Sequence, residues 1–240
     1  MRGWGSVTVG MGLTFFSAVA AAGTVAIDVG HYLERPGAIS AYGVTEFEYN
    51  HALAAVLAAR LASEGVPVRL IGHRGEMADL RARPREAEAA GAGFFLSIHH
   101  DSVKEEHLQP WNWNGRALRH AEGFAGFSLF VSRLNPRLDE SLACASAIGA
   151  ALRRAGLPVA THHGVSSAGV ERPWADEANG VYFYDNLVVL KTATVPAVLL
   201  EAGVIVNRDE ERDLASAARR ALTADAVLQG LQQCGVAIVP

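Results

Sequence analysis

The sequence has few cysteines and no excess of basic charge, and each shortage excludes a class of protein. Its two cysteines, Cys144 and Cys234, lack the spacing of a zinc-thiolate site. The net charge of −4, counted with neutral histidines, creates no general basic field, which argues against nucleic acid as a partner. Half of the residues are hydrophobic, so a large core can form without disulfides.

The chain also lacks internal repeats, low-complexity tracts and linkers, which favours one domain over two small ones within its 240 residues. Strand and helix patterns alternate instead, which predicts an α/β fold with a mainly parallel sheet and helices on both faces. We expect strands at residues 24–29, 66–71, 93–98, 127–132 and 197–201. We expect helices at 46–63, 77–90 and 138–155, a helix end at 185–191, and one or two closing helices within 209–234.

The first 22 residues have the pattern of an export signal. Arg2 is the only charge before Asp28, and the apolar residues 7–22 end in three alanines, an A-x-A cleavage pattern. The stretch is short for a membrane span. We therefore expect a signal peptide at 1–22 and a domain at 23–240 that is periplasmic or secreted and not stably inserted in the membrane. The alternatives are an uncleaved anchor and a start assigned too early.

In an oxidising compartment, Cys144 and Cys234 could form a disulfide. They fall on separate predicted helices, and the sequence does not fix the distance between their Cα atoms. Of the two possibilities, we expect buried free thiols, with a disulfide as the alternative.

Two histidines follow predicted strands. His31 comes after Gly30, which permits a sharp turn that would aim the next side chain over the sheet. His99 ends the strand at 93–98. Because ligands bind beyond the carboxyl ends of parallel strands, both imidazoles would lie at the same edge of the sheet.

Two glutamates complete the candidate site. Glu46 opens a helix after Thr45, where the helix dipole alone could also explain a carboxylate; Glu48 has the spacing of a capping box. Glu201 ends the apolar run 195–200, where a carboxylate is costly unless it is paired or near a metal. A salt bridge to Arg83 or Lys191 is the structural alternative. Desolvation should raise the pKa of Glu201 toward values useful for proton transfer.

Together these residues indicate a zinc hydrolase. Two histidines and a glutamate, here His31, His99 and Glu46, are a common zinc ligand set, and Glu201 could move a proton of the attacking water. His162 and His163 are rival ligands. His100 should point away from His99 along an extended strand. Asp28 could orient a ligand histidine.

Two segments do not fit the strand–helix pattern. Residues 101–125 contain Trp111 and Trp113, and residues 160–181 contain Trp174. They are either binding loops, whose tryptophans could stack on a sugar or line a peptide groove, or structured inserts with packing aromatics.

The chain resembles the zinc-dependent N-acetylmuramoyl-L-alanine amidases of the Amidase_3 type from about residue 25 to near the C-terminus. The matching motifs are Ile27-Asp28-x-Gly30-His31, Pro36-Gly37-Ala38, Gly43-x-x-Glu46-x-x-x-Asn50, Leu80-x-x-Arg83, Ser97-Ile98-His99 and Pro196-Ala-Val-Leu-Leu-Glu201-x-Gly203-x-x-x-Asn207. The resemblance implies Zn²⁺ held by His31, Glu46 and His99, Glu201 as the catalytic acid/base, peptidoglycan as substrate and a six-stranded sheet. It leaves any activator unknown.

The chain departs from the family pattern beside the implied ligands. Val29 and Tyr32 stand where proline and glycine are usual, His100 and Asp101 stand where a small residue and asparagine are usual, and Val204 replaces an aromatic. These departures leave open a zinc hydrolase acting on another cell-wall or small amide. A non-catalytic peptidoglycan-binding protein is a further alternative, against which the intact ligand set argues.

Overall fold

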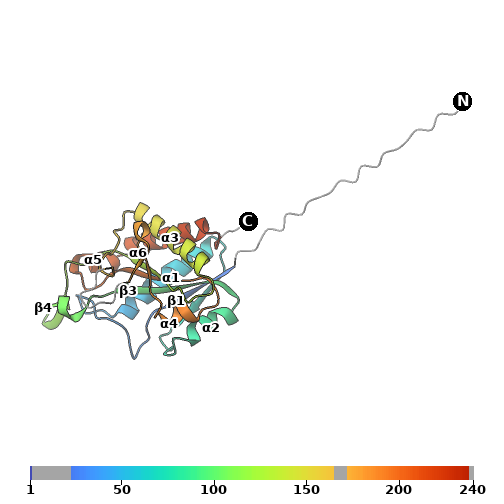
Figure 1. The fold of residues 1–240 in the computed structure, drawn as a ribbon. Helices are drawn as coiled ribbons and strands as arrows, with labels where there is room; N and C mark the ends of the chain where they lie inside the picture. Colours follow the sequence, from blue (N-terminus) through green and yellow to red (C-terminus); the bar gives the residue numbers. More distant parts are fainter. Residues whose placement is uncertain (2–22, 165–171, 238–240) are drawn as a thin grey trace.

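The computed structural model describes residue 1, residues 23–164 and residues 172–237. The expected signal peptide at 1–22 lies almost entirely outside these residues. The described chain forms a central sheet with helices on both faces, and a small hairpin extends from one end (Figure 1). Within the described residues, no helix has the length and apolar character needed to cross a membrane.

The sheet contains seven strands in the described part of the chain, in the order β2-β1-β3-β9-β6-β8-β7. The neighbours β2, β1, β3 and β9 run parallel, whereas β6 is antiparallel to β9 and β7 is antiparallel to β8. Their bounds are β1 Thr24–Val29, β2 Val68–Ile71, β3 Ala92–Asp101, β6 Ser128–Val131, β7 Trp174–Asp176, β8 Val181–Phe183 and β9 Ala197–Val204.

The mainly parallel sheet is confirmed, and its strand number exceeds the expected six by one. The strands β7 and β8 have three residues each, and most of this pair lies in the segment 160–181, for which a binding loop and a structured insert are the two expected alternatives. Such short strands contain too few residues to show a period of two.

Alternate strand residues bury two cores, as expected for a sheet covered on both faces. One core lies against α1, α3 and α6, and the other against α2 and α4 (Figure 1). The helices are α1 Glu46–Ser63, α2 Ala82–Ala89, α3 Leu138–Arg154, α4 Val188–Thr192, α5 Arg208–Leu214 and α6 Ala217–Gln233, with short 3₁₀ turns η1 Glu105–His107 and η2 Glu177–Asn179.

Helix α1 begins where the sequence predicts. The Thr45 hydroxyl accepts a hydrogen bond from the Glu48 amide at 3.4 Å, which is one half of the expected capping box. Glu46 is therefore the first helical residue. Helix α2 begins later than the expected residue 77. The backbone around Asp79 forms a turn, in which the Asp79 carboxylate accepts from Arg81 N at 2.8 Å.

Both strands that carry the candidate site run further than predicted. β3 continues through His99 to Asp101, and β9 continues through Glu201 to Val204. His99 and Asp101 are tolerated inside β3 because each has a polar partner. One oxygen of Glu201 in β9 has none among the described residues. The ladder between β3 and β9 becomes irregular between His99 and Asp101.

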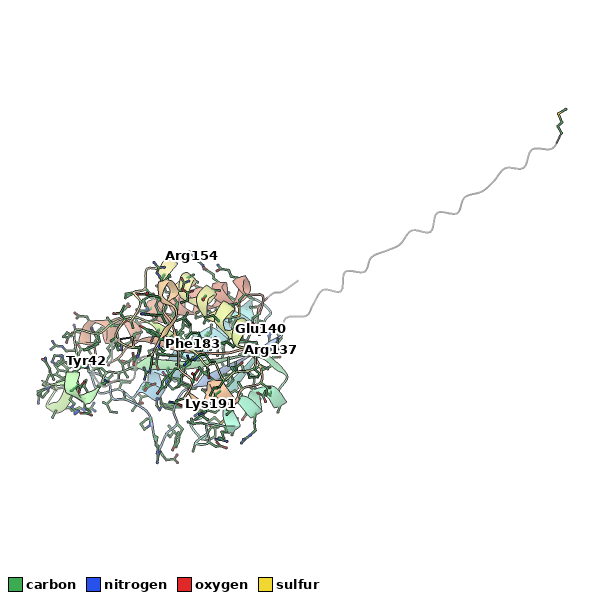
Figure 2. All side chains as sticks on the ribbon, in the orientation of Figure 1. Tyr42, Arg137, Glu140, Arg154, Phe183 and Lys191 are labelled. Atoms are coloured by element: carbon green, nitrogen blue, oxygen red, sulfur yellow. A yellow bond between two sulfur atoms is a disulfide. The ribbon has the colours of Figure 1, made fainter. Side chains whose placement is uncertain are left out.

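The segment 101–125 is a structured insert, because it forms the antiparallel hairpin of β4 (Gln109–Trp113) and β5 (Arg116–His120). Asn114 and Gly115 both have positive φ angles, of 50° and 78°, as a type I′ hairpin turn requires. Tyr42 lies at this end of the molecule (Figure 2) and contacts Trp111 and Trp113 edge-on, with ring centroids 5.3 and 5.0 Å apart.

The expectation of free thiols is wrong, because Cys144 and Cys234 form a disulfide between α3 and the end of α6. Their Cα atoms lie 5.1 Å apart, within the usual range for a cystine. The two helices pack on each other over the same face of the sheet, a tertiary contact that the local sequence pattern does not specify.

Candidate active site

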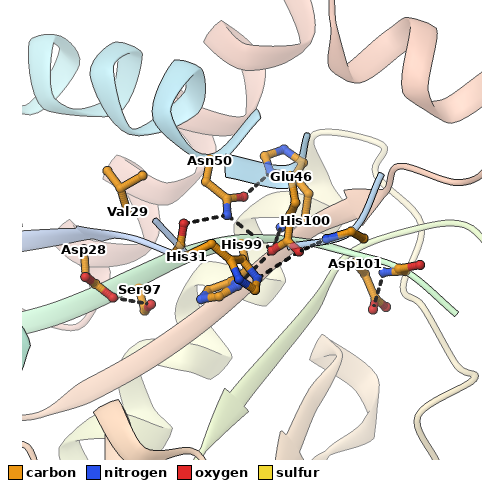
Figure 3. A network of polar contacts seen from close by, with 12 residues as sticks. Asp28, Val29, His31, Glu46, Asn50, Ser97, His99, His100 and Asp101 are labelled. Atoms are coloured by element: carbon orange, nitrogen blue, oxygen red, sulfur yellow. Dashed lines mark hydrogen bonds and ion pairs between the residues drawn. The ribbon is translucent and has the colours of Figure 1, made fainter. Parts of the chain in front are cut away.

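The Glu46 carboxylate lies between two histidines at the carboxyl end of the sheet. Glu46 Oε2 is 2.9 Å from His31 Nε2, and Glu46 Oε1 is 2.9 Å from His99 Nδ1. The imidazole rings are 4.9 Å apart, and Figure 3 shows the three side chains converging. The structure thus brings together the three predicted ligands, with their ligand atoms within 4.8 Å of one another.

Gly30 provides space rather than the expected turn. The positive φ, 67°, belongs to His31, whereas Gly30 has no positive φ. A Cβ at Gly30 would lie 2.3 Å from His99 Nε2, so any side chain there would collide with the ring. The left-handed backbone of His31 is unusual for a residue with a side chain, and it turns the chain at the end of β1.

The carboxylate of Glu46 is fixed by groups that are not candidate ligands. Ala38 N donates to Oε2 at 3.2 Å, and Asn50 Nδ2 donates to Oε1 at 3.3 Å and to the Gly30 carbonyl at 3.2 Å (Figure 3). Burial opposes ionisation of Glu46, but the contacts with His31 and His99 outweigh it and lower its pKa well below the ordinary value. Glu46 is therefore a buried anion flanked by imidazoles.

Glu201 stands beside this group on the neighbouring strand, paired with His99 in the parallel ladder of β9 and β3. The residue is partly exposed, but its Oε2 atom is buried and has no hydrogen-bond partner among the described residues. Burial, and then the negative charges of Asp101 and Glu46, raise the pKa of Glu201 well above its ordinary value, in the direction the sequence predicts.

A cavity of about 330 Å³ opens on these side chains. His31, His99 and Glu201 line it on the sheet side. Leu187 and Val188, at the start of α4, line it as well. The arrangement places two of the three predicted ligands and the Glu201 carboxylate on one concave, partly apolar surface, as ligand sites usually are.

Asp28 does not contact a ligand histidine, contrary to the expectation. It pairs with the buried Arg83, whose Nη1 lies 2.7 Å from Asp28 Oδ1, and it accepts from Ser97 Oγ at 2.7 Å. Arg83 also donates to the carbonyl groups of Val29, His31 and Met77. Because Asp28 engages Arg83, the guanidinium is not available to Glu201. Within the described residues, Glu201 forms no salt bridge with Arg83 or with Lys191, the other partner considered.

Comparison with known proteins agrees with this geometry. The profile of the family described as N-acetylmuramoyl-L-alanine amidase matches residues 25–233, which is most of the chain. The chain belongs to this family. It is therefore an enzyme of the class that hydrolyses the amide between N-acetylmuramic acid and L-alanine in peptidoglycan. No curated protein sequence gives a significant match.

Several solved structures have the same fold as the enzyme. Ami1 from Mycobacterium smegmatis has a TM-score of 0.70 at 20% identity, over 89% of this chain and 97% of that one. The catalytic domain of CwlV from Bacillus (Paenibacillus) polymyxa var. colistinus has a TM-score of 0.65 at 24% identity, over 88% and 96%. CwlD from Clostridioides difficile, in complex with the GerS lipoprotein, has a TM-score of 0.65 at 20% identity, over 88% of this chain and 98% of that one.

The other histidines considered from the sequence lie outside the group of His31, Glu46 and His99. The sequence predicts that His100 points away from His99; its ring lies against α1, with Nδ1 2.8 Å from Asn50 Oδ1 (Figure 3). Burial lowers the pKa of His100 to about 3, so the ring stays neutral. The proposed rivals, His162 and His163, gather instead around Asp101. No local pattern in the sequence indicates that Asp101 would lie against them.

The tryptophans divide into packed and exposed residues. Trp111 Nε1 donates to the Ala41 carbonyl at 2.9 Å, which attaches the hairpin to the loop before α1. Trp174 stacks on Tyr182 with ring centroids 3.7 Å apart. Trp113 has 38% of its surface exposed. Of the three, Trp113 alone presents a large aromatic surface to a possible substrate.

Proposed function

We propose that this amidase is a zinc enzyme in which His31, Glu46 and His99 hold the metal and Glu201 is the catalytic acid and base. The observation that carries the proposal is the pairing of Glu201 with His99 in one ladder. It sets the Glu201 carboxylate beside the proposed ligand His99, and both residues line the same cavity.

The ligand set fits zinc. Two imidazole nitrogens and one carboxylate oxygen converge, as in catalytic zinc sites that keep a further position open. The buried negative charge of Glu46 is costly in isolation, and a cation held among the three groups would offset that cost. Asn50 and Ala38 hold the carboxylate in place from behind, which is the role of outer partners at metal sites.

The metal would polarise the scissile carbonyl and make water a stronger nucleophile at neutral pH. Glu201 would accept a proton from the attacking water as its oxygen bonds to the carbonyl carbon. The same carboxyl would then donate that proton to the amide nitrogen as the carbon–nitrogen bond breaks. The products are the carboxylate of the muramic acid lactyl group and a peptide with a free N-terminal L-alanine.

We also propose that the enzyme acts outside the cytoplasm, after removal of residues 1–22. The Cys144–Cys234 disulfide supports this location, because disulfides persist mainly in oxidising compartments. The substrate, peptidoglycan, lies in the same place.

Product analysis tests the proposed bond. Purified peptidoglycan is digested with the zinc-loaded enzyme, and the soluble products are identified by mass spectrometry and by N-terminal labelling. Peptides that begin with L-alanine, with sugar chains left intact, support the proposal. New amino groups on other residues would favour a different cell-wall amide. Binding without any release, unchanged in Glu201→Ala, would favour a non-catalytic binding protein.

A further inference from the structure

A second group of side chains that could bind a metal gathers at the end of β3. It shares no member with the group of His31, Glu46 and His99. His162 Nε2 and His163 Nε2 lie 2.8 and 2.7 Å from the same oxygen, Asp101 Oδ2. The three ligand atoms lie within 4.8 Å of one another. The group is built on Asp101, one of the positions where this chain departs from the family pattern.

The surroundings of this group are those of a ligand site rather than of a surface ion pair. The side chains of Asp101 and His163 are about nine-tenths buried, with 10% and 8% exposed. Asp101 Oδ1 accepts from Ser102 N at 2.8 Å, which leaves Oδ2 directed at the histidines. Phe124 packs edge-on against His162, and Phe130 against His163.

One nitrogen in the group has no proper partner. His163 Nε2 is buried and, despite its short distance from Asp101 Oδ2, makes no aligned hydrogen bond to any described residue. A buried imidazole nitrogen in this state is costly, and a cation between it and the carboxylate would satisfy both. Two imidazoles and one carboxylate suit zinc and related divalent transition metals.

We infer that Asp101, His162 and His163 form a second binding site for a divalent transition-metal ion, separate from the site at Glu46. Such an ion would join the segment before residue 165 to β3, on the strand that also carries His99. The second site would thus fix one border of the active-site region without sharing a ligand with the first.

Arg172 competes with metal binding at this site. Its Nη1 lies 2.6 Å from His163 Nδ1, and a guanidinium can only donate, so Nδ1 accepts and Nε2 carries the ring proton. A metal on Nε2 requires the proton to move to Nδ1 and the guanidinium to withdraw. Arg172 can remain nearby, because it also stacks over the Tyr184 ring at 4.2 Å from the centroid.

Zinc titration of the purified, metal-stripped protein tests the inference. The protein is equilibrated with buffered free Zn²⁺, and bound metal is counted by mass spectrometry. We expect about two ions per chain. His162→Ala or His163→Ala should lower the affinity for one of the two ions by at least about 100-fold, since even changes to residues that contact a ligand lower metal affinity by roughly 10–100-fold. His107→Ala, an exposed histidine outside both groups, is the matched control.

Variants of the first site separate this inference from the proposed function. His31→Ala should lose one ion and keep the other, whether or not the enzyme cleaves peptidoglycan. The ion retained in each variant also shows that the chain is folded. A single ion in the wild type, unaffected by His162→Ala and His163→Ala, would overturn the second site.

Arg172→Gln tests the competition. Removing a charged donor from His163 Nδ1 should tighten the second ion by about tenfold, the scale of one hydrogen bond to a charged group. The same change should leave the first ion unaffected. Weaker binding of the second ion in Arg172→Gln would contradict the competition and would indicate that Arg172 supports the site.

Discussion

Glu201 and His99 face each other across the parallel ladder that joins β9 to β3. Paired residues in a ladder point to the same face of the sheet, so this register places the carboxylate proposed as the acid and base beside a proposed metal ligand. A shift of the register by one residue would move Glu201 to the opposite face. The geometry of the site therefore depends on the central strands and less on the loops around them.

The first prediction concerns the pH dependence of stability in metal-free protein. The pKa of Glu201 is raised in the folded protein. The contribution of the protonated carboxyl to folding stability is therefore fully present below the ordinary pKa of 4.5 and is lost as pH rises through the folded pKa. Metal-free Glu201→Gln mimics the protonated carboxyl. Its free energy of unfolding should equal that of the wild type near pH 4.5 and be larger than that of the wild type at pH 8. The slope of the difference is at most about 1.4 kcal/mol per pH unit.

Urea unfolding in EDTA at several pH values measures that difference. A constant offset between the two proteins across the whole pH range would contradict the raised pKa of Glu201.

The second prediction concerns Gly30. Gly30→Ala places a Cβ against the His99 ring, which must move away from Glu46. We expect zinc affinity at the first site to fall by about tenfold or more, the scale of a disturbed ligand orientation. Gly123→Ala is the control, because a Cβ there meets nothing within 4 Å. Equal zinc affinity in the two variants would show that His99 adapts without cost.

The third prediction concerns the buried ion pair of Arg83 and Asp28. Arg83→Met leaves Asp28 as an unpaired buried charge, so we expect a loss of about 3–5 kcal/mol in the free energy of unfolding. Arg85→Met removes the exposed pair of Arg85 and Asp79 and should leave the free energy of unfolding almost unchanged, because solvent screens exposed ion pairs. Denaturant titration of both variants checks the contrast. Similar small losses would mean that water reaches Asp28.

The fourth prediction concerns the disulfide. Cys144 and Cys234 are 90 residues apart, so their bond restricts a long loop of the unfolded chain. In the double variant Cys144→Ala/Cys234→Ala, the free energy of unfolding should fall by about 2–4 kcal/mol. Reduced wild-type protein should show a similar midpoint of urea unfolding. An unchanged midpoint after reduction would indicate that the two thiols do not pair in solution.

The parts of the fold that the sequence predicted are those with strong local signals. Helix α1 has apolar residues at helical spacing and a threonine cap, and the apolar runs that became β1, β3 and β9 are buried strands. The four site residues were found because each stands after an apolar run or at a helix start. Their roles as ligands and acid/base stay predictions.

The parts that the sequence missed depend on contacts between distant residues, or on a local signal that was overlooked. The sequence allows Asp28 to orient a ligand histidine, because nothing local indicates that Arg83 would be buried against it. The disulfide depends on how α3 packs on α6. The hairpin β4–β5 is different, since the Asn114-Gly115 pair is a strong hairpin signal in the sequence itself.

The most direct test of the account is zinc content and peptide release, measured side by side for wild type and Glu201→Gln. We predict that both proteins retain zinc at the first site and that release falls by about 10²–10⁴-fold in the variant, the usual contribution of a general acid–base. Wild-type release that persists undiminished in Glu201→Gln would contradict the central role given to Glu201.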